Sequence, residues 1–205
     1  MLSKHVNFAK AQAVWPEGRE AEMNLFTVFK AEIGANTEAA GEEKPGRILR
    51  LTASTAYMAF LNGELLSCGP ARAGHGHFRV DELELGSGKA ELEIIVAGYN
   101  LNAFEYIDQT SFLCAEIAEG ERILAWTQPG TGEGGFTAYE HPYHVQKIQR
   151  YSFQRAFAEA YDLRRSPNGD CLKLAAVMSG VYLERGVREA DFSEITPAAV
   201  TCRGA

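Results

Sequence analysis

One stretch of the sequence, GYNLNAFEYID at residues 98–108, combines the side-chain types that bind sugars. Aromatic faces stack on the C–H patches of a sugar ring, while amides and carboxylates hydrogen-bond its hydroxyl groups. The alternative is that the asparagines serve unusual backbone angles of a loop and the aromatic residues belong to the core. We predict a weak ligand-binding site at five residues of this loop: Tyr99, Asn100, Asn102, Glu105 and Tyr106.

Four of the five histidines fall in two pairs, in HGH at residues 75–77 and in HPYH at residues 141–144. With Asp81 or Glu140, these pairs contain ligand types of a zinc or other transition-metal site. Neither pair lies on a demonstrable helix face, and short polar loops often contain histidine. We therefore expect no metal and no other cofactor. A stand-alone metal-dependent sugar-modifying enzyme remains the alternative.

The signatures of other reaction centres are weak or missing. Glycines at 130, 132 and 135 satisfy G-x-G-x-x-G, but the following residues show no helical stripe, so no helix N-terminus is expected for a pyrophosphate. There is no G-x-S-x-G elbow, and Cys68 and Cys171 lie in apolar stretches where a thiol is normally inert. Acidic residues are numerous, but their spacing places no pair across a cleft. We predict no catalytic residue in this chain.

The segments that position these groups are predicted to be β-strands. Leu49, Leu51 and Ala53 alternate with polar residues, the period of a strand with one buried face. The Asn62-Gly63 pair tolerates the positive φ angles of a type I′ turn and predicts a tight hairpin. The predicted strands are 25–33, 47–54, 57–61, 64–68, 78–85, 90–98, 111–118 and 122–127.

Short strands separated by glycine-rich turns predict an all-β fold, an antiparallel β-sandwich of jelly-roll, galactose-binding-like type, with a smaller β-rich C-terminal segment. We expect a sandwich domain at 1–148, and a β-rich linker or the start of a second β domain at 149–205. Residues 151–163 fit either a helix or a strand, and residues 172–183 favour a strand.

Composition narrows the class of partner. A net charge of −7 over 205 residues argues against binding a nucleic-acid backbone. No run approaches the ~18–20 apolar residues of a membrane span. The N-terminus has no continuous apolar region of a secretory signal, and the four cysteines are far apart, with no C-x-x-C spacing. We expect reduced thiols and a cytoplasmic protein, with secretion as the alternative if a signal peptide has been removed.

The order of segments along the chain resembles the N-terminal β-sandwich of bacterial α-L-rhamnosidases and related glycoside hydrolases. The resemblance rests on TAYMAFLNGELLSCGPAR, then FRVDELEL, then GKAELEIIVAGYN. Trp15-Pro16 is similar to the family's opening, and QRYSFQRAFAEAYDL and YLERGVREADF resemble stretches that join the sandwich to later domains. In that family the sandwich precedes an (α/α)₆ barrel that carries the acidic catalytic residues. The barrel has no counterpart in this sequence, so no catalytic residue is carried over.

The resemblance implies a non-catalytic, carbohydrate-associated domain of an α-L-rhamnosidase-like glycoside hydrolase. Such a domain would bind glycan weakly or buttress the catalytic domain. Its partners would be a carbohydrate, with a rhamnose-containing glycan among the candidates, and the catalytic domain of the same polypeptide. A purely structural interaction module is the third hypothesis.

Overall fold

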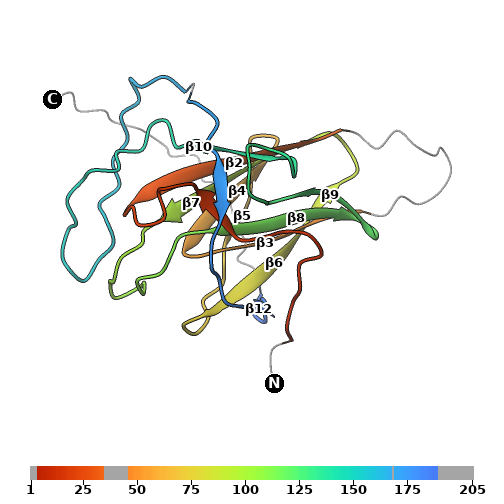
Figure 1. The fold of residues 1–205 in the computed structure, drawn as a ribbon, viewed down its shortest axis with the longest axis horizontal. Coiled ribbons are helices and arrows are strands. Elements are labelled where there is room, and N and C mark those ends of the chain that lie inside the picture. Colours follow the sequence, from red (N-terminus) through yellow and green to blue (C-terminus); the bar gives the residue numbers. More distant parts are fainter. Residues whose placement is uncertain (1–3, 35–45, 168, 189–205) are drawn as a thin grey trace, which may run out of the picture.

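The computed structural model describes residues 4–34, 46–167 and 169–188, and two β-sheets packed face to face form its framework (Figure 1). The seven-stranded sheet has the order β11-β1-β8-β3-β6-β12, with β9 paired to β8, and the five-stranded sheet has the order β10-β2-β7-β4-β5. The strands are β1 (Val14–Pro16), β2 (Leu25–Ile33), β3 (Arg47–Ala53), β4 (Ala56–Leu61), β5 (Glu64–Gly69), β6 (His77–Gly86), β7 (Ala90–Gly98), β8 (Leu113–Glu119), β9 (Arg122–Trp126), β10 (Phe136–Glu140), β11 (Leu174–Ala176) and β12 (Val181–Glu184).

The strand pairs formed by the described residues are antiparallel except β12 with β6, which is parallel. The predicted antiparallel β-sandwich is therefore confirmed. No helix among the described residues is long and apolar enough to cross a membrane.

The hairpin between β4 and β5 turns at the predicted pair. Asn62 has a φ of 52° and Gly63 a φ of 83°, so both central residues are left-handed, as a type I′ turn requires. The Asn62 side chain also accepts the backbone N–H of Glu91 at 2.9 Å and so fastens the turn to β7.

The core lies between the two sheets and follows the alternation in the sequence. Leu49 and Leu51 on β3 and Phe29 on β2 are fully buried there, and Trp15 on β1 packs against Phe29 with ring centroids 6.2 Å apart. Residues between them, such as Arg50, point away from the core. Strands such as β3 show this alternation because one face packs on the core, whereas β8 is buried on both faces because the N-terminal arm covers its outer face.

The C-terminal segment contributes two strands to the seven-stranded sheet. β11 pairs with β1, and β12 pairs with β6 at the far edge of the strand order. Residues 151–163 form neither a helix nor a named strand, and only isolated bridges such as Arg150↔Phe157 pair them. The division at residue 148 stays a prediction, and residues 189–205 lie outside the described part of the chain.

An N-terminal arm, residues 4–13, runs along the outer face of the seven-stranded sheet. The backbone N–H groups of Ala9, Lys10 and Ala11 donate to the carboxylate of Glu116 at 2.9–3.3 Å. Farther along, the Val6 N–H donates to the carbonyl of Tyr182 at 3.0 Å. The arm is thus held at one end by a buried carboxylate on β8 and at the other by β12.

Candidate functional site

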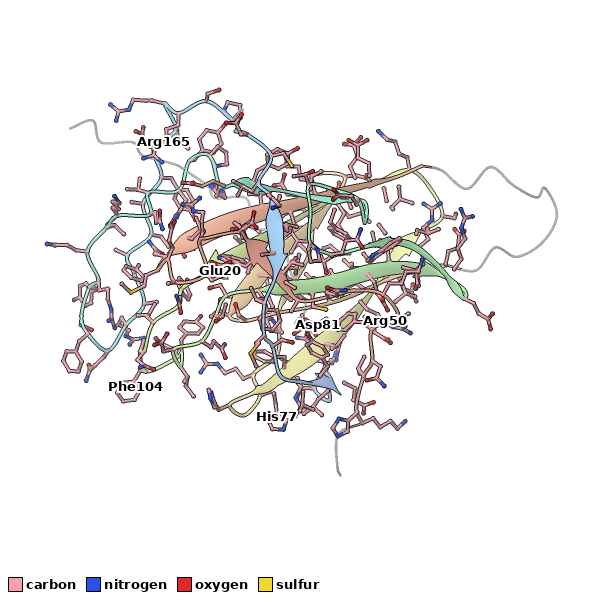
Figure 2. All side chains as sticks on the ribbon, viewed as in Figure 1. Glu20, Arg50, His77, Asp81, Phe104 and Arg165 are labelled. Carbon is pink, nitrogen blue, oxygen red and sulfur yellow. The ribbon has the colours of Figure 1, made fainter. Side chains whose placement is uncertain are left out.

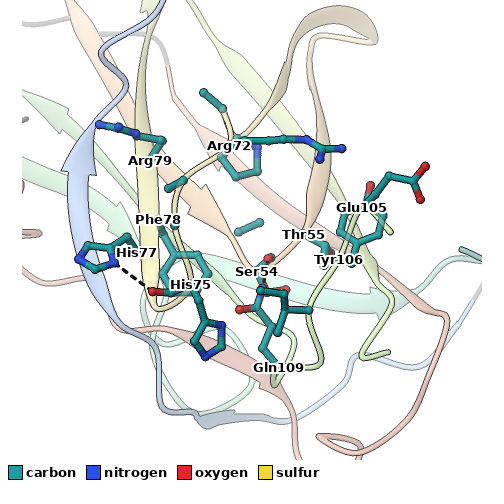
Figure 3. Close-up of a pocket in the computed structure, with 16 residues that line it drawn as sticks. Ser54, Thr55, Arg72, His75, His77, Phe78, Arg79, Glu105, Tyr106 and Gln109 are labelled. Carbon is teal, nitrogen blue, oxygen red and sulfur yellow. Dashed lines mark hydrogen bonds between the residues drawn. The ribbon is translucent and has the colours of Figure 1, made fainter. Parts of the chain in front are cut away.

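A hollow of about 170 Å³ lies where the connection between β5 and β6 meets the loop after β7 (Figure 3). We call it the Tyr106 hollow. Three segments that are distant in sequence line it: the end of β3, residues 70–79 and residues 105–109. Its polar and aromatic lining residues are Ser54, Thr55, Arg72, His75, His77, Arg79, Glu105, Tyr106 and Gln109.

The floor of the hollow is fixed by hydrogen bonds to Ser54, the residue after β3. The Ser54 N–H donates to the carbonyl of Phe112 at 3.1 Å, and the Phe112 N–H donates to Ser54 Oγ at 3.1 Å. The side-chain amide of Gln109 donates to the Ser54 carbonyl. These bonds hold the loop after β7 against the end of β3, so Tyr106 has a defined position relative to the sheet.

Arg72 forms the opposite wall. Its side chain extends toward Glu105 and Tyr106, whereas Arg79 points to the other side, where it donates to the Glu184 carbonyl at 2.9 Å (Figure 3). Among the described residues, the Arg72 guanidinium has no hydrogen-bond or ion-pair partner. Burial raises the pKa of Tyr106, and the charge of Arg72 opposes that rise. The phenol is therefore a neutral donor near a cation with open donor sites.

Glu105 reaches the same hollow from the loop after β7. Its Oε1 accepts a hydrogen bond from the Arg155 guanidinium at 2.7 Å, so one carboxylate oxygen is engaged and oriented by the neighbouring loop. The hollow therefore offers an aromatic ring, a guanidinium, a carboxylate and an amide within one concave surface, the set of groups that recognises a polyhydroxylated ligand.

The structure places two of the five predicted residues in the lining of the hollow and three outside that lining. Tyr106 and Glu105 line the hollow. Tyr99 packs its ring on Tyr106 at 4.8 Å between centroids. Asn100, with a φ of 45°, donates to the Glu20 carbonyl at 3.1 Å, and Asn102 Oδ1 accepts the Asp108 N–H at 2.8 Å. The asparagines shape the loop, and ligand binding by all five residues stays a prediction.

Sequence reasoning did not identify Arg72 or Gln109 as site residues, and it considered His75 only as a possible metal ligand. Gln109 belongs to the same loop as Tyr106. Arg72 and His75 come from the connection between β5 and β6, which the pairing of β3 with β6 and β8 brings close to Tyr106. A single arginine within an otherwise small-residue connection, PARAGHG, is the signal that could have indicated a side chain reserved for a ligand.

The two histidine pairs lie in different places. His77 Nδ1 approaches the His75 carbonyl at 3.0 Å beside the Tyr106 hollow. His141 and His144 belong to an aromatic cluster at the opposite sheet. Asp81, a predicted alternative ligand, instead accepts the Tyr57 hydroxyl and is paired with Arg185. In the part of the chain that the structure describes, no three His, Cys, Asp or Glu side chains are grouped to hold a metal.

Three cysteines have described positions, and all three are free thiols. Cys114 is buried, Cys68 is half-buried and Cys171 is exposed. Burial raises the pKa of Cys114 to about 12, so that thiol stays protonated. Cys202 lies outside the described residues.

Comparisons with known proteins give matches to solved structures. No family model matches the sequence, and no curated protein matches it. The chain is similar to a GH78 family rhamnosidase of Bacillus sp. GL1, at 20% identity and a TM-score of 0.72 over 91% of this chain and 20% of that one. It is also similar to α-L-rhamnosidases from Dictyoglumus thermophilum (12% identity, TM-score 0.56, covering 85% and 22%) and Aspergillus terreus (13%, 0.53, 83% and 21%).

These likenesses establish the fold. The β-domain resemblance expected from the order of segments is confirmed, and the chain spans about a fifth of the length of the rhamnosidases it matches.

Proposed function

We propose that this chain, which shares its fold with a β domain of α-L-rhamnosidases, is a non-catalytic carbohydrate-binding domain. Its binding site is the Tyr106 hollow, and the residues that bind are Tyr106, Glu105 and Arg72. The polypeptide to which it belongs would be an α-L-rhamnosidase-like glycoside hydrolase.

The observation that carries the proposal is the convergence of an aromatic ring and three kinds of polar group on one small concavity (Figure 3). The Tyr106 ring would lie against the C–H face of a sugar, and the Arg72 guanidinium and the Glu105 carboxylate would take opposite hydrogen-bonding roles toward its hydroxyls. A volume of about 170 Å³ is below the ~300–1,000 Å³ of typical ligand pockets, so the hollow suits one terminal sugar and weak binding.

Isothermal titration or NMR titration with L-rhamnose and with rhamnosylated oligosaccharides tests the proposal. Tyr106→Ala and Arg72→Ala should each lower the affinity about fivefold or more, because each removes roughly 1 kcal/mol of stacking or hydrogen bonding. The matched control is Phe104→Ala, since Phe104 lies on the same loop, is exposed and does not line the hollow.

Equal losses of affinity in Tyr106→Ala and Phe104→Ala would show that the hollow is not the binding site. Undetectable binding of these sugars at about 10 mM would contradict the proposed binding function, because a dissociation constant above 10 mM corresponds to a binding free energy of less than ~3 kcal/mol.

A second candidate function, buttressing another part of the same polypeptide, is favoured by a patch of exposed aromatic side chains. Phe104, Tyr151 and Phe153 are 82%, 91% and 81% exposed, and Figure 2 shows Phe104 at the end of the sandwich where these loops lie. The two loops are joined by a hydrogen bond from the Phe104 N–H to the Gln154 carbonyl at 2.8 Å. Exposed apolar patches of this kind mark protein contacts.

Sedimentation of the isolated chain tests this second function. An uncovered contact patch should cause concentration-dependent self-association that the double variant Phe104→Ser, Phe153→Ser abolishes. A chain that stays monomeric at high concentration, with or without these changes, argues against it.

A further inference from the structure

A larger hollow, of about 400 Å³, lies on the outer face of the five-stranded sheet. We call it the Tyr139 hollow. Val28 and Lys30 on β2, Glu93 on β7 and Tyr139 on β10 line it, and residues 141–143 form its side. These strand residues alternate with core residues such as Phe29 and Ile94, so their side chains point out of the sandwich.

The strand register sets these side chains in two rows. Tyr139 on β10 is paired with Val28 on β2, and Lys30, two residues farther along β2, is paired with Glu93 on β7. In the first row Val28 is almost fully buried in a cluster with Phe26, Ile95 and Ala97, so Tyr139 is the accessible member. The second is polar, with Lys30 Nζ 3.0 Å from Glu93 Oε2. An aromatic ring beside a polar row matches the C–H groups and the hydroxyl groups of a sugar ring.

The charges around the Tyr139 hollow are compensated. Lys30 and Glu93 neutralise each other, and Glu140 accepts a hydrogen bond from the Arg19 guanidinium at 2.7 Å. A charged ligand would therefore find no unpaired opposite charge among the side chains that line the hollow and would lose its hydration without an ion pair in return. A neutral ligand with many hydroxyl groups meets no such penalty.

His141 adds an oriented donor at the side of the hollow. Its Nδ1 accepts the backbone N–H groups of Tyr143 at 3.3 Å and His144 at 3.1 Å, so the ring proton resides on Nε2. Burial lowers the pKa of His141, which keeps the imidazole neutral. Tyr143 supplies a second aromatic ring, with its centroid 6.2 Å from that of His141.

We propose that the Tyr139 hollow is a second binding site, for a neutral mono- or disaccharide. Tyr139 and Tyr143 provide the aromatic surface, and Lys30, Glu93 and His141 hydrogen-bond the hydroxyl groups. A volume of about 400 Å³ falls within the ~300–1,000 Å³ of ligand pockets and accommodates one or two sugar rings. The site shares no residue with the Tyr106 hollow, so experiments can disprove binding at one hollow without disproving it at the other.

NMR titration of the labelled full chain with lactose, L-rhamnose and D-glucuronate tests the proposal. We expect saturable shifts of the Tyr139, Tyr143 and Lys30 resonances with at least one neutral sugar, and weaker or no shifts with the anionic D-glucuronate. If no neutral sugar shifts these resonances at about 10 mM, the proposal is wrong, because a glycan-binding site is expected to have a dissociation constant in the millimolar range or below.

Three variants locate the binding. Tyr139→Ala and Tyr143→Ala should each weaken it about fivefold or more, and Tyr139→Phe, which keeps the ring, should retain most of it. Met58→Ala is the control, because Met58 is exposed on the same sheet, outside the hollow. Near-UV circular dichroism checks that each variant is folded.

Tyr106→Ala separates this site from the proposed function. If that variant alone abolishes the sugar response and the Tyr139 variants do not, the Tyr139 hollow is not a binding site and the Tyr106 hollow is. The reverse result assigns all binding to the Tyr139 hollow.

Discussion

Two buried polar side chains, His144 and Asp81, show how single residues set the properties of this protein. His144 is 3% exposed and lies flat against Phe26, with ring centroids 3.9 Å apart and planes 8° apart. Burial lowers the pKa of His144 to about 4. The charge of His141, once that ring is protonated, and the charge of Arg165 act in the same direction, while Glu140 opposes them. The imidazole is therefore neutral at ordinary pH and packs as an aromatic ring.

His144 should make the stability depend on pH. The unfolded state binds a proton below pH ~6.5, whereas the folded state does so only near pH 4, so the contribution is complete above ~6.5 and is lost as the pH falls. We expect His144→Phe to reduce the loss of unfolding free energy between pH 7 and 5 by about 2 kcal/mol, measured by urea denaturation.

The control for this measurement is His75→Gln, an exposed position that should keep the wild-type pH dependence. Identical pH profiles for wild type and His144→Phe would contradict the assignment.

Asp81 joins the two sheets through side chains. It is 1% exposed on β6, accepts the hydroxyl of Tyr57 from β4, and is paired with Arg185 at 2.5 Å. A carboxylate in the interior is stable only with such partners, because desolvation otherwise disfavours its charge.

Replacing Asp81 should be costly. Asp81→Asn removes the charge that pairs with Arg185 and leaves a single amide oxygen as acceptor for the Arg185 guanidinium and the Tyr57 hydroxyl, so it should lower the unfolding free energy by about 3 kcal/mol. The neighbouring Glu82, an exposed partner of Arg50, is the matched control, and Glu82→Gln should cost at most ~1 kcal/mol. Chemical denaturation measures both, and similar losses would show that Asp81 is not a buried link.

At the scale of elements, the N-terminal arm depends on one carboxylate. Glu116 on β8 is fully buried, and the main chain of residues 9–11 supplies its donors, with Arg50 Nη1 3.8 Å away. The arm covers Cys114 and Phe112, which form a cluster with Ala13 and Phe78.

Glu116→Gln should release the arm. A carboxamide cannot accept all of these N–H groups, so we expect a loss of about 2 kcal/mol and faster amide exchange at residues 9–11. Hydrogen-exchange mass spectrometry measures the amide exchange of the arm directly. Glu84→Gln, exposed on the same sheet, should change neither quantity, and unchanged exchange in Glu116→Gln would exclude the carboxylate as the anchor.

The β4–β5 hairpin depends on a backbone conformation. Gly63 has a φ of 83°, and a Cβ there would meet no atom within 4 Å, so the cost of Gly63→Ala is conformational and should be about 1 kcal/mol. Gly88 is equally open but has no positive φ, and Gly88→Ala should change the unfolding free energy by less than ~0.5 kcal/mol. Equal effects would contradict the left-handed turn.

At the scale of the whole molecule, segments from both ends of the described chain complete one sheet. β1 lies between β11 and β8, and the N-terminal arm lies beside β12. We therefore expect one cooperative unfolding transition, in which the fluorescence of the buried Trp15 coincides with the circular dichroism of the sheets. The measurement uses Trp126→Phe to isolate Trp15. Separate transitions would support a C-terminal segment that folds independently.

The sequence by itself determined the local elements. Alternating apolar residues and the Asn62-Gly63 turn predict the central strands and the hairpin, because side-chain period and turn dihedrals are properties of neighbouring residues. The sequence also shows that residues 98–108 contain the residue types that bind sugars. In the structure, however, the side chains of Asn100 and Asn102 hydrogen-bond the backbone and shape the loop.

The tertiary structure alone decided which distant residues meet. Glu116 accepts N–H groups 105–107 residues away, Arg72 faces Tyr106, and Lys30 is set beside Glu93 by strand register. No local pattern marks a charged side chain on a strand as buried or exposed, since burial depends on what the chain places over it. Strand positions follow from local sequence, whereas both hollows and the buried charges follow from long-range pairing.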